Sequence, residues 1–214
     1  MIIIRIIVLF LFLIFVEKYP KLKNFSGETK FNVYRSLICL YFTLYSFDNV
    51  INNLFKGYVE PFDYKVLGFQ DVSEWFMAYI MLDMGKMIWM KNKRWDLYVH
   101  HIWALGSWMI ANHYNKLGFL HNLILTGEAI SIVTGIDAIH MEEKDMEKSK
   151  QCKLYRKNVI KYLRLPVWII TLLVTLHQSH NLPPLMFWNG ILTSGLMIWL
   201  DRFWERKCDK VIGL

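Results

Sequence analysis

Seven apolar segments along a chain of 214 residues constrain its fold more than any other feature of the sequence. They are Ile2–Val16, Tyr34–Phe55, Trp75–Met90, Leu97–Asn112, Leu117–Ile139, Leu163–Leu176 and Leu185–Leu200. A helix needs about 20 apolar residues to cross about 30 Å of hydrocarbon, and several segments are about a turn short of that. Hydrophobic residues make up 55% of the chain, which is high for a soluble domain. We therefore expect an all-α membrane protein with about seven transmembrane helices.

The first apolar segment carries a charged residue and allows two interpretations. Arg5 lies within it, as in the charged start of a signal peptide, but no Ala-x-Ala-like cleavage site follows, and Glu17-Lys18-Tyr19-Pro20 comes next. We expect the segment to be retained as a span. The alternative is a segment that lies at the membrane interface, which leaves six spans and moves the N-terminus to the other side.

The basic residues sort by loop and predict the orientation. Most lie after the first, third, fifth and seventh segments, whereas the opposite loops hold only Lys56, Lys65 and Lys116. The positive-inside rule makes the basic side cytoplasmic, so the N-terminus is outside and the C-terminus inside. The net charge of +7 is then a matter of topology, and we expect no binding to nucleic acid. The sequon at Asn24 is expected to face the cytoplasm.

Four ionisable residues inside the apolar segments are candidate functional residues: Asp83, His100, His101 and Glu128. Such side chains are costly to desolvate and rare in spans, so each needs a reason to be there. At 1.5 Å per residue, Asp83 lies roughly 10 Å from the cytoplasmic end of its span, and the two histidines lie about a turn from theirs. We therefore expect all four around one polar chamber in the cytoplasmic half of the bundle.

Helical spacing separates the two adjacent histidines. Ala104 and Ser107 follow His100 at +4 and +7, and small residues mark the faces on which membrane helices approach closely. We expect His100 to face the bundle and His101 to contact a neighbouring helix. Ser131 shares a face with Glu128, so the predicted lipid pocket includes Ala104, Ser107 and Ser131.

The four ionisable residues allow more than one kind of chemistry. A histidine beside a carboxylate is a general base or a nucleophile, which suits acyl transfer. We do not expect a metal site, because adjacent histidines lack the i, i+4 spacing that places two on one metal. The alternative is that these side chains only pair across helices and fix the packing.

The segment Trp75–Ile110, with an Asp in mid-span, a short basic loop and then Trp and His-His, resembles the TLC domain of TRAM, Lag-type and CLN-type proteins. The resemblance continues through Gly127-Glu128-Ala129-Ile130-Ser131 and Arg164-Leu165-Pro166-Val167-Trp168. It covers residues 34–204 and implies a TLC-type bundle around the polar chamber. Residues 1–33 then form an N-terminal span with a cytoplasmic loop, and 205–214 a short basic cytoplasmic tail.

Within that family the ceramide synthases join a fatty acyl group from acyl-CoA to a sphingoid base. Their signature has a His-Asp-x-x-Ser-Asp motif where this chain reads Gly127-Glu128-Ala129-Ile130-Ser131, without the His and the second acid. The chain is more similar to the family members that are not synthases, which implies a role in lipid trafficking, sensing or membrane lipid homeostasis. The alternative is an acyl-CoA-dependent N-acyltransferase in which His100, His101, Asp83 and Glu128 are catalytic.

The resemblance also implies an endoplasmic-reticulum-type membrane, with membrane lipids as partners and a homodimer within the membrane as a further option. No cofactor is expected, and acyl-CoA is a substrate if the chain is an enzyme. A transporter is a weaker alternative, since the sequence lacks an inverted repeat and a pair of broken spans.

Overall fold

A computed structural model describes residues 2–55, 69–114 and 116–213, and their regular structure is helical throughout. The α-helices are α1 (Ile2–Lys18), α2 (Gly27–Phe55), α3 (Phe69–Trp89), α4 (Trp95–Tyr114), α5 (Gly118–Thr126), α6 (Ala129–Glu142), α7 (Met146–Val159), α8 (Leu165–His177) and α9 (Pro184–Ile212). A short 3-10 helix spans Pro20–Leu22, and a π-helical turn, Ile160–Arg164, joins α7 to α8. The prediction of an all-α fold is confirmed. Lys56 and Lys65, in the loop after the second segment, lie outside the described residues.

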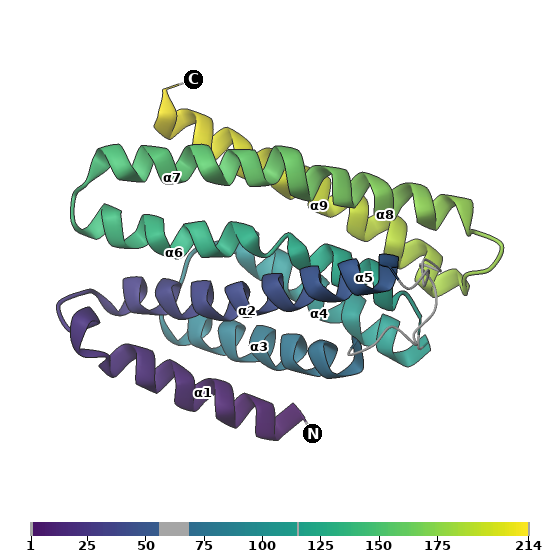
Figure 1. Ribbon diagram of the computed structural model, residues 1–214, viewed down its shortest axis with the longest axis horizontal. Helices are drawn as coiled ribbons and strands as arrows, with labels where there is room; N and C mark the ends of the chain where they lie inside the picture. The colour runs from purple at the N-terminus through teal and green to yellow at the C-terminus, as the bar shows by residue number, and fades with distance from the viewer. Residues whose placement is uncertain (1, 56–68, 115, 214) are drawn as a thin grey trace.

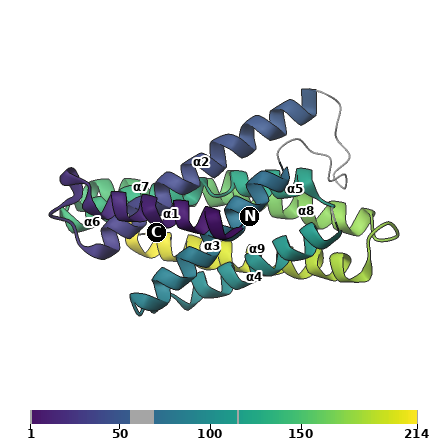
Figure 2. The ribbon, with the colours of Figure 1, turned by 90° about the horizontal axis from the view of Figure 1, so that it is seen from below.

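The helices form a bundle of rods that lie side by side along the long axis of the molecule (Figure 1). Helix α2 packs along α6, α6 along α7, α7 and α8 along α9, α9 against α4, and α4 against α3. Because α5 and α6 follow one another directly, as do α7 and α8, each apolar segment lies on a rod of its own. The C-terminal half of α2 diverges from the other helices (Figure 2).

Helix α1 runs along the outside of the bundle, against α3 and α2 (Figure 1). Arg5 Nη2 lies 3.0 Å from Glu74 Oε2 near the start of α3, and Glu17 Oε1 accepts a 2.6 Å hydrogen bond from Lys86 Nζ near its end. Ion pairs therefore tie both ends of α1 to α3, and the two helices are parallel. The first apolar segment lies along the bundle and not across the helix ends.

The predicted fifth segment, Leu117–Ile139, is interrupted at Gly127 and Glu128. The backbone N–H of Glu128 bonds to Leu125 O and that of Ser131 to Glu128 O, three residues apart instead of four. Gly127 O accepts a hydrogen bond of 3.2 Å from Arg164 Nη1. A side chain that bonds to a backbone carbonyl in this way is a usual cause of a break in a helix.

The polar residues between the fifth and sixth apolar segments form most of helix α7. Its N-cap residue, Asp145, accepts a 3.1 Å hydrogen bond from Lys148 N. The helix does not end before the next apolar segment but continues through the π turn into α8. Pro166 lies in the first turn of α8, and a proline has no N–H to bond to the preceding turn. The π turn places Arg164 at this join.

The outer face of the bundle is apolar. Exposed side chains along α1 include Ile3, Ile7, Leu11 and Phe15, and α2 and α8 carry similar rows, namely Leu37, Leu40, Leu44, Ile51, Ile169, Ile170, Leu173 and Leu176. By length and composition, Gly118–Glu142 and Met146–His177 are the rods that are long and apolar enough to cross a membrane within the described chain. Polar and charged residues such as Asp83, Ser194 and Asp201 are buried beside a hydrophobic core. An exposed apolar surface of this extent is unusual for a water-soluble protein.

Candidate functional site

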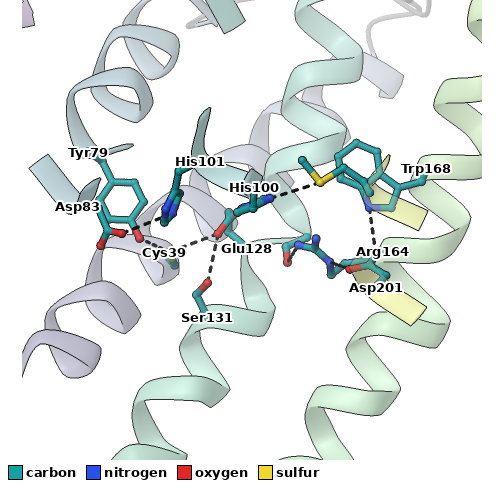
Figure 3. Close-up of polar contacts among 12 residues, drawn as sticks. Cys39, Tyr79, Asp83, His100, His101, Glu128, Ser131, Arg164, Trp168 and Asp201 are labelled. Carbon is teal, nitrogen blue, oxygen red and sulfur yellow. Dashed lines mark hydrogen bonds and ion pairs between the residues drawn. The ribbon is translucent and has the colours of Figure 1, made fainter. Parts of the chain in front are cut away.

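The candidate site is a cavity of about 110 Å³ inside the bundle. Side chains from α2, α3, the loop before α4, α4, the α5–α6 junction, α6, α7, the π turn and α9 line it. They are Glu28, Asn32, Arg35, Tyr79, Asn92, Arg94, Leu97, His100, His101, Glu128, Ile130, Ser131, Thr134, Arg156, Arg164 and Trp204. Segments far apart in the sequence therefore meet around one space. Figure 3 shows the polar contacts that surround it.

His101 contacts a buried ion pair between Arg35 and Asp83. Arg35 donates from Nε to Asp83 Oδ1 at 2.6 Å and from Nη2 to Asp83 Oδ2 at 2.7 Å. Asp83 has no exposed surface, and its Oδ2 lies 3.5 Å from His101 Nε2 (Figure 3). Two bonds in fork geometry to one carboxylate fix both partners. The carboxylate then orients the imidazole with its Nε2 toward α3.

His100 lies next to the second carboxylate of the site. Its Nε2 is 4.0 Å from Glu128 Oε1, and its Nδ1 is 3.4 Å from Met197 Sδ (Figure 3). Glu128 Oε2 accepts hydrogen bonds from Ser131 Oγ at 3.3 Å and from Cys39 Sγ at 3.5 Å. The break in the α5–α6 rod brings Glu128 to this position.

A second buried ion pair connects the π turn to α9. Arg164 Nε donates to Asp201 Oδ1 at 2.8 Å, and Trp168 Nε1 donates to Asp201 Oδ2 at 3.1 Å (Figure 3). The Arg164 side chain is 2% exposed and that of Asp201 is fully buried. Arg164 also holds Gly127 O, so one guanidinium connects α9 with the residue beside Glu128.

A third group of charges lies at the end of the cavity where α4 begins. Asp96 Oδ2 accepts hydrogen bonds from Arg94 Nη2 at 2.5 Å and from Trp204 Nε1 at 2.7 Å. Burial raises the pKa of Asp96, but these two hydrogen bonds outweigh burial and hold the pKa at about 2. Lys207 Nζ lies 3.8 Å from Asp96 Oδ1. The carboxylate therefore joins the loop before α4 to the last turns of α9.

The structure brings the four predicted ionisable residues together as two pairs, His101 with Asp83 and His100 with Glu128. Both histidines, Glu128 and Ser131 line the cavity, whereas Asp83 lies behind it. Contact of His101 with a neighbouring helix agrees with the analysis of helical spacing. What these residues do chemically stays a prediction.

Two of the three predicted pocket residues lie elsewhere. Ala104 is buried in the main hydrophobic core, and Ser107 Oγ accepts a 3.0 Å hydrogen bond from Asn189 Nδ2 on α9. Neither is among the described residues that line the cavity. On this helix the small residues pack against neighbours, because the cavity is confined to the first turns of α4.

Sequence reasoning missed Arg35, Asp201 and the pairing of Arg164, although these charges hold the site together. Arg35 and Arg164 each lie within a turn of the start of a predicted segment and were not weighed as intramembrane charges. The argument that identifies Asp83 as a candidate also applies to Arg35 and Arg164, because a charge in an apolar segment requires a partner. The partner itself cannot be read from spacing, since Arg35 and Asp83 lie 48 residues apart.

The arrangement offers two histidine–carboxylate pairs around a small space with several guanidinium groups. Such pairs can hold or move a proton at an imidazole nitrogen, as a general base requires. In the part of the chain that the structure describes, no three or more His, Cys, Asp or Glu side chains are arranged to hold a metal ion.

No family model, curated protein or solved structure matches this chain.

Proposed function

We propose that this chain is a multi-pass membrane protein of the TLC type whose cavity binds the polar end of a lipid, in lipid trafficking, sensing or membrane lipid homeostasis. The apolar outer surface and the charged residues buried within the bundle support the membrane setting. An apolar outer surface of this extent suits hydrocarbon and is unfavourable in water. The resemblance to TLC proteins supports the lipid class.

The observation that carries the proposal is the cavity itself. His100, His101 and Glu128 line a space inside a bundle whose outside is apolar. Placing these groups in a membrane protein is costly, and residues retained at such a cost are functional by default. The cavity is small compared with pockets of roughly 300–1,000 Å³ that hold drug-sized ligands. It therefore suits the headgroup of a lipid, with the chains outside.

We further propose seven spans in an endoplasmic-reticulum-type membrane, with the N-terminus outside and the C-terminus in the cytoplasm. The packing of α1 along α3 supports a membrane span for the first apolar segment, which makes seven spans, over an interfacial position. Contacts between the basic loops support a common side for them. Ser26 N and Oγ donate to Glu142 at 2.6 and 2.8 Å, and Lys157 Nζ lies 2.6 Å from Asp209 Oδ1. The cavity then lies in the cytoplasmic half.

The test is the identity of lipids that copurify with the full chain. Wild-type protein and the His100→Ala/His101→Ala variant are purified in a mild detergent, and the bound lipids are identified by mass spectrometry. His177→Ala/His180→Ala is the matched control, because it removes two histidines at the other end of α8. We expect a lipid that is enriched with wild type and control and lost with the cavity variant. Equal lipid content in all three proteins would count against the proposal.

The second candidate is an acyl-CoA-dependent N-acyltransferase of the ceramide-synthase type. The two histidine–carboxylate pairs favour it, at 3.5 Å for His101 with Asp83 and 4.0 Å for His100 with Glu128. In that reaction a histidine takes a proton from the attacking amine, and coenzyme A leaves as the thiol. Purified protein is given labelled acyl-CoA and a sphingoid base. Labelled amide that disappears with His100→Ala or His101→Ala would establish the enzyme, and lipid binding without turnover would exclude it.

A further inference from the structure

Three side chains that line the cavity carry buried nitrogens with no hydrogen-bond partner among the described residues. Nη2 of Arg164, Nε of Arg156 and Nδ1 of His101 are buried and have no hydrogen-bond partner among the residues that the structure describes. All three side chains line the cavity, and they come from the π turn, α7 and α4. The side chains of Arg164 and His101 are 2% and 8% exposed, so bulk water does not readily satisfy them. Buried polar groups without partners are costly, and such groups around a cavity indicate a ligand.

Arginines outnumber glutamates among the side chains that line the cavity, with Arg35, Arg94, Arg156 and Arg164 against Glu28 and Glu128. Arg35, Arg94 and Arg164 are each paired with an aspartate. Arg156 is different, because it lies 4.0 Å from Asp137 Oδ2, a carboxylate that also bonds Lys153 and Ser149. The positive charge of Arg156 is therefore only partly neutralised. A ligand that bonds to Arg156 Nε and Arg164 Nη2 must supply oxygen acceptors, and a negative charge on it would complement Arg156.

The tautomer of His101 further restricts the chemical class of the ligand. With Nε2 toward Asp83, the proton of the neutral ring lies on Nε2, and Nδ1 is an acceptor. The lining then offers two guanidinium donors and one imidazole acceptor, each from a different element of the fold. A carboxylate has two oxygens and no proton to offer at neutral pH. A phosphate monoester has three terminal oxygens and a second pKa near 6, so it shares one proton with Nδ1 while it accepts from both arginines.

We propose that Arg156, Arg164 and His101 form a binding site for a phosphate group, either the monoester headgroup of a lipid such as phosphatidate or free phosphate. The inference rests on the proposed lipid-binding function and specifies its ligand. The cavity of about 110 Å³ is well above the roughly 10–15 Å³ that a single water needs and well below the roughly 300–1,000 Å³ of pockets for drug-sized ligands, so it accommodates a phosphate but not an acyl chain. The phosphate occupies the cavity, and the chains of a lipid lie against the apolar outer surface.

The experiment measures thermal unfolding of the full, delipidated chain in detergent with increasing amounts of four probes: dioleoyl phosphatidate, dioleoylglycerol, oleate and inorganic phosphate. Arg156→Gln removes one donor. Since Arg164→Gln alone leaves Asp201 buried without its partner, the second variant is Arg164→Gln/Asp201→Asn. The control is Arg202→Gln, which makes the same change at a side chain that is 53% exposed. Loss of one charge-assisted hydrogen bond is expected to weaken phosphatidate binding about tenfold or more.

Stabilisation of the wild type and the control by phosphatidate, but not by dioleoylglycerol, with a loss in Arg156→Gln, supports a lipid phosphate. Equal stabilisation by inorganic phosphate supports free phosphate as the ligand. If dioleoylglycerol or oleate stabilises as well as phosphatidate, or if both cavity variants respond like wild type, the phosphate site is refuted while lipid binding stands. If none of the probes stabilises the wild type and no lipid copurifies with it, the proposed function falls too.

Discussion

Removing either partner of the buried Arg35–Asp83 pair is expected to destabilise the bundle strongly. The two charge-assisted hydrogen bonds are 2.6 and 2.7 Å long, and Asp83 is fully buried. In Arg35→Met, Asp83 keeps only the 3.5 Å contact with His101 Nε2 as a charge partner among the described residues. Breaking a buried ion pair from one side costs about 3–5 kcal/mol, because the other charge stays buried without compensation. We expect a loss in the free energy of unfolding near the upper end of that range.

The reciprocal change, Asp83→Leu, is expected to cost less, about 3 kcal/mol. Arg35 then keeps Asn32 Oδ1 as an acceptor at 3.4 Å and the ring of Phe31, whose centroid lies 4.3 Å from its Cζ. The double variant Arg35→Met/Asp83→Leu leaves neither charge, and apolar replacements of buried pairs are often neutral. The coupling between the two positions should therefore be at least about 4 kcal/mol.

The assay is equilibrium unfolding of the purified chain in mixed micelles, followed by far-UV circular dichroism, for the wild type, both single variants and the double variant. A matched control is Arg202→Met, an exposed arginine in a pair with Glu205, which should change stability by less than about 1 kcal/mol. Two results would refute the reasoning. One is a single variant as stable as wild type, and the other is a double variant whose loss equals the sum of the single losses.

Three further predictions concern stability and topology. The pKa of Asp96 is about 2 in the folded chain and ordinarily about 3.9, so its carboxylate stabilises the fold above about pH 4, on the order of 1–2 kcal/mol. This stabilisation is lost as the pH falls toward 2. Asp96→Asn should remove that part of the pH dependence of the free energy of unfolding. Gly135→Ala should cost about 1–3 kcal/mol, because the added Cβ would lie 2.6 Å from Asn32 O on α2, while Gly106→Ala, with nothing within 4 Å, should not destabilise in the same assay. Asn24 should carry no glycan when the chain is made in eukaryotic cells, as an electrophoretic shift on glycosidase treatment would reveal, and a glycan there would reverse the proposed orientation.

Local patterns in the sequence were enough to predict the helices. Each predicted apolar segment lies on one helical rod of the structure. Helices can be predicted in this way because the length and composition of an apolar segment are properties of residues that are neighbours in the sequence. The same reasoning missed the break at Gly127 and Glu128. That break is accompanied by a bond from Arg164, 37 residues away, to a backbone carbonyl, and such a contact leaves no local trace in the sequence.

The sequence by itself determined that the chain is all-helical and that Asp83, His100, His101 and Glu128 lie within apolar segments, where polar groups need partners. Only the tertiary structure decided the partners, Asp83 with Arg35 and His101, and Glu128 with His100, Ser131 and Cys39. The physical reason is that the spacing of residues fixes which side chains share a face of one helix. The order and rotation of the helices in the bundle depend on packing between distant segments, and these set which faces meet.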